Sequence, residues 1–237
     1  QICKFFHPTC AFGWPNWAGC IGSYKHSKRM KHLLSSISLL PICALAIVLS
    51  AGNAAAQRAN VVGDKPAFED LPSPEFAGGK QKVFKPKDWL ELEAKLRISL
   101  SPTPLSKTCE RLTVKWYVAV KNPEKPGAML LLTKDVEHVN APLDEDVYCS
   151  VYLSPASIKR LTGSDRGGKN CVEYVGYEVL INGEKVASET SKGQVGWWNT
   201  ASNKISRSDT VPLLNKAETP FSTLWWDRYA EVSTPGK

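Results

Sequence analysis

The sequence predicts a mainly β fold, an immunoglobulin-like β-sandwich of about seven strands with one short connecting helix and a C-terminal amphipathic helix. Three observations support this prediction. Apolar and polar residues alternate in several segments, turn residues recur at short intervals, and the C-terminal region repeats apolar residues every three or four positions. A small β-barrel with a helix is the alternative architecture.

The alternation is clearest in WLELEAKLRISL (89–100) and RLTVKWYVAVK (111–121). In the first segment leucine, alanine and isoleucine alternate with mostly charged residues, and in the second Trp116 belongs to the apolar set. A period of two places one face of a strand in a core and the other in water. We also expect strands in AMLLLTKDVEHV and DVYCSVYL, joined by the acidic turn LDED.

The next two features are a short helix and a hairpin. Ser154 suits an N-cap, Pro155 the first helical position and Gly163 the stop, which predicts one or two helical turns between them. Asn182 and Gly183 lie between two β-rich arms, and this pair favours a tight type I′ turn.

The C-terminal region predicts an amphipathic helix that begins at Thr219-Pro220 and covers one face or one edge of the sandwich. The segment QVGWWN (194–199), which precedes it, is predicted to add a last short strand. The apolar stripe of the predicted helix consists of Phe221, Leu224, Trp225, Tyr229 and Val232.

The chain before Gln57 has the three-part build of a secretory signal peptide. A basic stretch at 28–32 precedes a mostly apolar run from Leu33 to Leu49, and small residues follow up to Ala56. We expect cleavage after Ala56. A retained membrane anchor is the alternative, although the apolar run is short for a spanning helix, which needs roughly 20 residues.

A signal peptide acts from the N-terminus, so we expect translation to begin at Met30. Residues 57–87 contain four prolines and no sustained period, which predicts a linker with one short edge strand at Val83-Phe84. The expected organisation is an upstream extension (1–29), a signal peptide (30–56), a flexible linker or arm (57–87), an immunoglobulin-like domain that includes the C-terminal helix (88–232) and a tail (233–237).

Removal of the signal peptide changes the charge balance. The whole chain has 30 basic and 23 acidic residues, a net charge of +7. Five of the basic residues and none of the acidic ones lie before Gln57, which leaves 25 against 23 and a net charge of +2. A nucleic-acid interface gathers basic residues on one face, whereas here they are mixed with acids. We therefore expect no nucleic-acid partner.

Residues 57–237 show no catalytic constellation. Their one histidine, His138, lies among charged neighbours on a predicted strand, and we expect its side chain to be exposed. Neither a glycine-rich phosphate loop nor a nucleophile elbow is present. Asp144, Glu145 and Asp146 could hold calcium but lack the spacing and glycine of a calcium loop, so a solvated turn is predicted. We expect no enzymatic activity, metal or cofactor.

Three cysteines follow the predicted cleavage site, and export permits a disulfide. In an immunoglobulin-like topology, the loop that carries Cys109 and the start of the strand that carries Cys149 lie at the same end of the sandwich. We therefore predict a disulfide between Cys109 and Cys149. Cys171 falls at the opposite end and is predicted to be a free thiol.

Two tryptophan pairs are the candidate binding residues: Trp197 with Trp198, and Trp225 with Trp226. Neighbouring side chains point in different directions, so one ring of each pair can be buried while the other is exposed. An exposed indole offers a platform for a sugar ring or for a protein partner. The alternative is that both members of each pair are structural.

Several long runs resemble a known family: LTVKWYVAVKN, HVNAPLDEDVYCSVYLSPASIKRLTG, VGYEVLINGEKVASE with the following GWW, and TPFSTLWWDRYAEV. They resemble an immunoglobulin-like secreted protein of the type IV pilus-like gene cluster of Akkermansia and related Verrucomicrobia, over about residues 84–232. The resemblance implies an immunoglobulin-like fold, export and association with pili or the cell envelope. It implies no enzymatic activity and supplies no catalytic residues.

One feature departs from type IV pilins, which are cut ahead of a helix that remains as the filament core. Here NAAAQ (53–57) suits ordinary signal peptidase, which removes the helix. We therefore expect an exported, non-catalytic interaction domain that acts as an adhesion or assembly accessory in the periplasm, at the outer-membrane surface or outside the cell. Edge strands and exposed tryptophans would contact a protein partner.

Three alternatives stay open. The first is a carbohydrate-binding module that uses the exposed tryptophans, and the second is a membrane-anchored pilin-like subunit. The third is an enzyme whose pocket is lined by carboxylates from distant strands.

Overall fold

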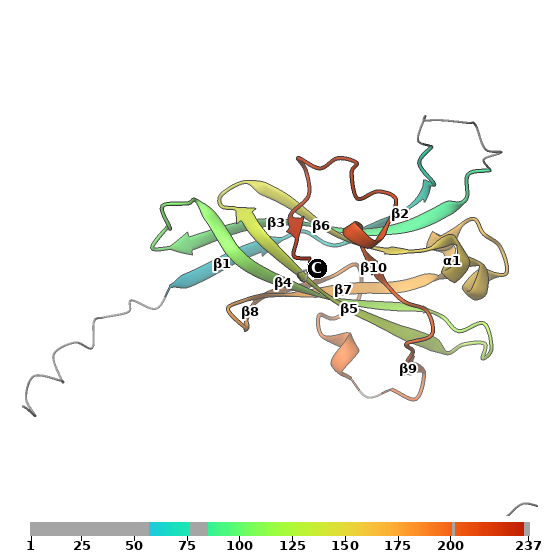
Figure 1. The fold of residues 1–237 in the computed structure, drawn as a ribbon. Helices are drawn as coiled ribbons and strands as arrows, with labels where there is room; N and C mark the ends of the chain where they lie inside the picture. The colour runs from blue at the N-terminus through green and yellow to red at the C-terminus, as the bar shows by residue number, and fades with distance from the viewer. Residues whose placement is uncertain (1–56, 76–84, 201, 235–237) are drawn as a thin grey trace, which may run out of the picture. The chain divides into compact units, whose positions relative to one another are not determined.

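The computed structural model describes residues 57–75, 85–200 and 202–234, and these residues form two sheets (Figure 1). All strand pairs among them are antiparallel except β5 with β9. The first sheet has the order β1-β3-β6-β10, and β2 also pairs with β3. The second has the order β11-β5-β4-β7-β8, and β9 also pairs with β5. The mainly β prediction is confirmed, although the strands are more numerous than predicted.

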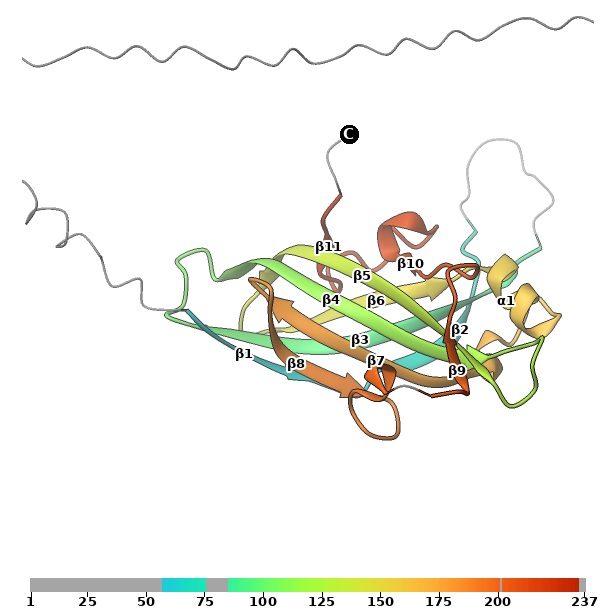
Figure 2. The same ribbon diagram turned by 90° about the horizontal axis from the view of Figure 1, so that it is seen from below.

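The elements run, in chain order, β1 (Arg58–Gly63), β2 (Ala67–Pro72), β3 (Asp88–Ser101), β4 (Thr108–Lys121), β5 (Met129–Pro142), β6 (Asp146–Leu153), α1 (Pro155–Thr162), η2 (Gly168–Cys171), β7 (Val172–Ile181), β8 (Glu184–Thr190), η3 (Trp197–Asn199), β9 (Ile205–Arg207), β10 (Leu214–Asn215), η4 (Lys216–Glu218) and β11 (Glu231–Val232). The strands lie in two layers, with α1 at one end of them (Figures 1 and 2).

The inner faces of the two sheets share one hydrophobic core. The predicted alternation of β3 and β4 is confirmed, because their apolar residues are buried while the polar residues between them are exposed or half-buried. Trp116 of β4 is fully buried, and its ring centroid lies 5.7 Å from that of Tyr177 on β7. The hydrophobic core therefore consists of the residues that the period-two pattern predicts to point inward.

The predicted connecting helix and hairpin are both confirmed. The Ser154 side chain caps α1 by accepting a hydrogen bond from the Ser157 N–H, and Gly163 ends the helix at a φ of 79°. Asn182 and Gly183 have φ values of 54° and 82°, the positive pair that a type I′ turn requires.

The prediction of a flexible linker over 57–87 is wrong for the part that the structure describes. Strands β1 and β2 both pair with β3, along Arg58–Gly63 and Ala67–Pro72. The Tyr177 hydroxyl adds a tertiary anchor by donating to the Asp64 carbonyl at 2.7 Å. These strands are missed because they are short edge strands without a clear period. The edge strand expected at Val83-Phe84 lies outside the described residues.

The predicted C-terminal helix does not form in residues 219–232, which the structure describes as turns and a short strand, and Trp197–Asn199 forms a 3₁₀ turn instead of a strand. Residues 216–230, here called the C-terminal loop, contain successive tight turns, such as Leu224 N–H to Phe221 carbonyl. Trp225 has a φ of 49°, which a regular helix does not allow. Side-chain contacts with the first sheet, described below, hold the loop in this shape. No helix among the described residues is both long and apolar enough to span a membrane.

The expectation that His138 is exposed is wrong as well. Its side chain is 1% exposed, because β11 pairs with β5 at this point and places Val232 opposite His138. Nδ1 lies 3.2 Å from the Ala230 carbonyl oxygen, and Nε2 has no hydrogen-bond partner among the described residues. Burial lowers the pKa of His138 to about 4 from its ordinary 6.5.

This burial predicts acid-dependent stability. As the pH falls from 6.5 to 4, the unfolded chain binds a proton at His138 that the folded chain does not, so folding loses about 3 kcal/mol. We expect His138→Leu to remove this part of the pH dependence in urea unfolding curves recorded between pH 4 and pH 7. Wild-type and variant curves with parallel pH profiles would contradict the assignment.

Candidate functional site

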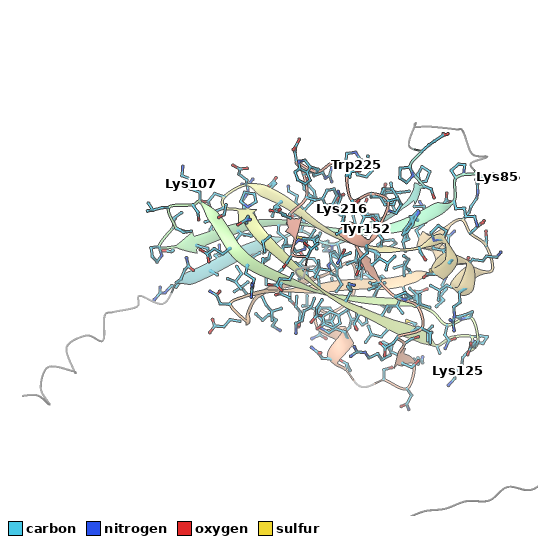
Figure 3. All side chains as sticks on the ribbon, viewed as in Figure 1. Lys85, Lys107, Lys125, Tyr152, Lys216 and Trp225 are labelled. Atoms are coloured by element: carbon cyan, nitrogen blue, oxygen red, sulfur yellow. The ribbon has the colours of Figure 1, made fainter. Side chains whose placement is uncertain are left out.

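The outward face of the first sheet carries a row of polar and aromatic side chains. Glu91 and Glu93 alternate with buried leucine and alanine on β3, and Tyr152 projects from β6 beside them, opposite Glu91 in the strand register. The C-terminal loop covers this row, with Trp225 at its outer side and Lys216 and Tyr152 nearer the sheet (Figure 3). The site therefore combines a regular sheet with an irregular segment distant in sequence.

A hydrogen-bond network joins the two carboxylates. The Tyr229 hydroxyl lies 2.9 Å from Glu91 Oε1 and 2.6 Å from Glu93 Oε2, and the Tyr152 hydroxyl donates to Glu91 Oε1 at 2.5 Å. Arg228 donates to Glu93 Oε1 at 2.7 Å. A phenol has one proton, so Tyr229 can donate to only one of the two carboxylates at a time.

The surroundings of this network shift the pKa values of Glu91 and Tyr229. Burial raises the pKa of Glu91, and the nearby charge of Glu93 raises it further, against the opposing effect of the tyrosine hydrogen bonds and Arg228. Burial and the two carboxylates also raise the pKa of the Tyr229 hydroxyl. Arg228 forms its ion pair with Glu93, so the groups that bind Glu91 directly are the two tyrosine hydroxyls.

The C-terminal loop is anchored by aromatic and cationic contacts. Phe221 is buried and stacks on Tyr152, with ring centroids 5.3 Å apart and planes 12° from parallel. The buried Lys216 ammonium donates to the Leu224 carbonyl and lies 4.8 Å from the centroid of the Tyr229 ring. The apolar spacing predicts a helix here. The loop adopts a different shape because these contacts hold its side chains directly against the sheet.

Trp225 and Trp226 are the exposed aromatic residues of the loop, at 51% and 71% exposure. Trp225 lines a pocket of about 340 Å³ between β2, β3 and the loop, together with Phe68 and the carboxylates. Trp226 lines a separate pocket of about 480 Å³ with Lys216 and Tyr229. The neighbouring indole rings of Trp225 and Trp226 therefore line two different pockets.

The other predicted pair, Trp197 and Trp198, packs against the second sheet. Trp198 is 8% exposed and stacks on Tyr117, with centroids 4.7 Å apart. A Cβ at Gly176 would lie 2.2 Å from the Trp198 ring, so the glycine lets the indole lie flat on β7. Trp197 is half-buried and donates its Nε1–H to the Thr190 hydroxyl at 3.1 Å. Trp198 is thus packed against the sheet, while Trp197 also lines a pocket of about 480 Å³ with Tyr174 and Ile205, and a binding role for this pair stays a prediction.

Cys109, Cys149 and Cys171 are buried free thiols, which differs from the predicted Cys109–Cys149 disulfide. Cys109 lies near the start of β4 opposite Ala141, whereas Cys149 lies inside β6 opposite Ala94 on the other sheet. The prediction placed Cys109 in a loop and Cys149 at the start of its strand, whereas Cys109 belongs to β4 and Cys149 is the fourth residue of β6. Burial raises the pKa of Cys109, and that of Cys171 to about 11.

The acidic turn forms ion pairs. Asp146 lies 2.9 Å from the Lys95 ammonium and 2.6 Å from the Arg97 guanidinium, while Asp144 accepts a hydrogen bond from the Ser99 hydroxyl. Within the described part of the chain, no three histidine, cysteine or acidic side chains are grouped as metal ligands.

Sequence reasoning named Trp225 and Trp226, which are exposed, but did not name Glu91, Glu93, Tyr152 or Tyr229 as site residues. The only local signal is that the two glutamates share one face of a strand. Their tyrosine partner Tyr229 lies 138 and 136 positions away, so no local pattern reveals the network.

Comparison with known proteins gives matches to a family model and to solved structures. A protein-family model matches residues 52–235. A crystal structure of a protein from Akkermansia muciniphila is 38% identical, with a TM-score of 0.72, and the match covers 76% of this chain and 96% of that chain. A search among curated proteins gave no match.

The different partners of Glu91 and Glu93 lead to a prediction about stability. At pH 7, we expect Glu91→Gln to leave the melting temperature unchanged or to raise it, because it replaces a partly buried carboxylate by a neutral amide. Glu93→Gln should cost about 1 kcal/mol, because it removes the partly exposed ion pair with Arg228. Calorimetric melting of the two variants tests this, and a larger loss for Glu91→Gln would contradict it.

Proposed function

This chain belongs to the family whose model spans residues 52–235, and from that premise we propose that it is an exported, non-catalytic interaction domain of the cell envelope, associated with pili or their assembly. The observation that carries the proposal is the exposure of Trp225 and Trp226 on a loop that is fixed to the sheet beneath it.

The strand order supports an immunoglobulin-like domain. With β3 as strand B, the first sheet contains neighbouring strands B and E, and the second sheet has the order C′-C-F-G in β5, β4, β7 and β8. Trp116 lies on the strand in position C and is fully buried, as the tryptophan of immunoglobulin domains is. Domains of this type commonly act by presenting surfaces to partners.

The physical state of the exposed tryptophans supports a binding role. Tryptophan is enriched among the residues that contribute most to protein interfaces. Phe221 lies under Trp225, with near-parallel rings 6.3 Å apart, so the indole is held before a partner arrives. A contact surface that is already ordered loses less conformational entropy on binding.

A carbohydrate-binding module is the second candidate function. The observation that favours it is the pocket of about 340 Å³ in which Trp225 lies beside Glu91, Glu93 and Arg228. An aromatic face next to hydrogen-bonding side chains suits a ring that has both an apolar face and hydroxyl groups.

Export is tested by the N-terminus of the protein recovered from the cells that make it. We expect a chain that begins at Gln57, in the periplasm, at the outer-membrane surface or in the medium, because signal peptidase would cut after Ala56. Intact mass and N-terminal sequencing of each cell fraction give the answer. A chain that keeps Leu33 to Leu49 would instead identify a membrane-anchored, pilin-like subunit.

The binding surface is tested by the double variant Trp225→Ala/Trp226→Ala. We expect it to release the protein from its envelope fraction and to weaken partner binding by 2 kcal/mol or more, about 30-fold, as for residues central to an interface. The melting temperature should hardly change, because both side chains are exposed. Leu105→Ala, at a fully exposed position away from the loop, is the matched control. Equal retention of both variants would contradict the proposal.

A further inference from the structure

We infer that the pocket between β2, β3 and the C-terminal loop is a subsite for one uncharged sugar ring. The inference rests on the proposed function, because it names the ligand class for part of the same surface. It depends on four features of the pocket: its aromatic wall, its open hydrogen-bonding groups, its internal ion pairs and its net charge.

The aromatic wall is Trp225. Trp225 is the last of three stacked rings: Tyr152 stacks on Phe221 at an interplanar angle of 12°, and Phe221 stacks on Trp225 at 13°. About half of the Trp225 side chain remains exposed, and it lines the pocket. A flat apolar surface in a fixed orientation suits the C–H face of a pyranose.

The pocket is also lined by hydrogen-bonding groups that can bind a ligand. Both tyrosine hydroxyls bind Oε1 of Glu91, and Oε2 receives no hydrogen bond from the described residues. Arg228 contributes N–H donors at the same pocket, where it lies against Glu93. Sugar hydroxyls both donate and accept, so they can pair with acceptor and donor together. A volume of about 340 Å³ accommodates one such ring.

The internal ion pairs argue against a cationic ligand. Arg228 already neutralises Glu93, and its guanidinium carbon lies 3.8 Å from the centroid of the Tyr148 ring. The Lys216 ammonium lies over the ring of Tyr229. Glu93 and the ring of Tyr229, two of the groups that would attract an ammonium or guanidinium, are therefore already paired with cations of the chain.

The net charge of the lining argues against an anionic ligand. Glu69, Glu91 and Glu93 face the pocket with Arg228 as the one cation among its lining residues. A sugar acid or a sulfated sugar would bring a further negative charge beside these carboxylates. An uncharged sugar avoids both the repulsion and the need for a free counter-ion.

The test is a titration of the chain from Gln57 onward with single sugars of different charge. The neutral probes are the methyl glycosides of glucose, galactose and N-acetylglucosamine, the anionic probe is methyl glucuronide, and the cationic probe is glucosamine. We expect saturable binding of at least one neutral glycoside in calorimetry and tryptophan fluorescence, and binding at least tenfold weaker for both charged probes.

Trp226→Ala is the matched control, because Trp226 is a neighbouring exposed indole that lines the other pocket. We expect Trp225→Ala and Glu91→Ala to abolish binding of the neutral glycoside and Trp226→Ala to leave it unchanged. Melting curves of all three variants show whether the fold is retained. If Glu91→Ala does not fold, Glu91→Gln, which should weaken binding at least threefold, replaces it.

The inference is overturned if no neutral glycoside saturates, if a charged probe binds more tightly, or if Trp226→Ala weakens binding as much as Trp225→Ala. The proposed function fails on a different result, namely unchanged envelope retention of the double tryptophan variant. Lost retention without sugar binding would leave the proposed function standing with a protein partner.

Discussion

Strand β3 contributes to the core and to the candidate site at the same time, because its two faces carry different chemistry. Its inner leucines and isoleucine are fully buried in the shared core. Its outer Glu91 and Glu93 receive the C-terminal loop through Tyr229 and Arg228. A slip of one residue in the register would exchange the two faces, so core packing also fixes the positions of the carboxylates. The geometry of the site therefore depends on the same pairings that stabilise the domain.

The loop that covers β3 illustrates how buried polar groups can determine local conformation. Glu91 is largely removed from water, and its hydrogen bonds come from tyrosines on β6 and on the loop. An unpaired carboxylate in that position would destabilise the fold, so the tyrosines and Arg228 have to remain close to β3. A continuous helix could not bring Phe221 onto Tyr152 and also turn at Trp225 with a positive φ. The exposed tryptophans are presented by this turn.

Features that depend on a few neighbouring residues could be predicted from the sequence. The caps of α1, the turn at Asn182-Gly183 and the alternation in β3 and β4 all follow from side chains within one or two turns of the chain. The edge strands β1 and β2, the burial of His138 and the shape of the C-terminal loop depend on partners far away in the chain. The same holds for the candidate site. The tryptophan pair can be recognised in the sequence, whereas the hydrogen bonds from Tyr229 to two glutamates can be recognised only in the folded structure.

The buried thiols have a consequence for the chemical reactivity of the folded chain. Thiolate is the form that attacks disulfides, and a raised pKa leaves little of it at neutral pH. Cys171, with a pKa of about 11, and Cys109 are held in this unreactive state by the fold. Burial of the sulfur atoms thus makes the folded domain slow to enter thiol–disulfide exchange at neutral pH.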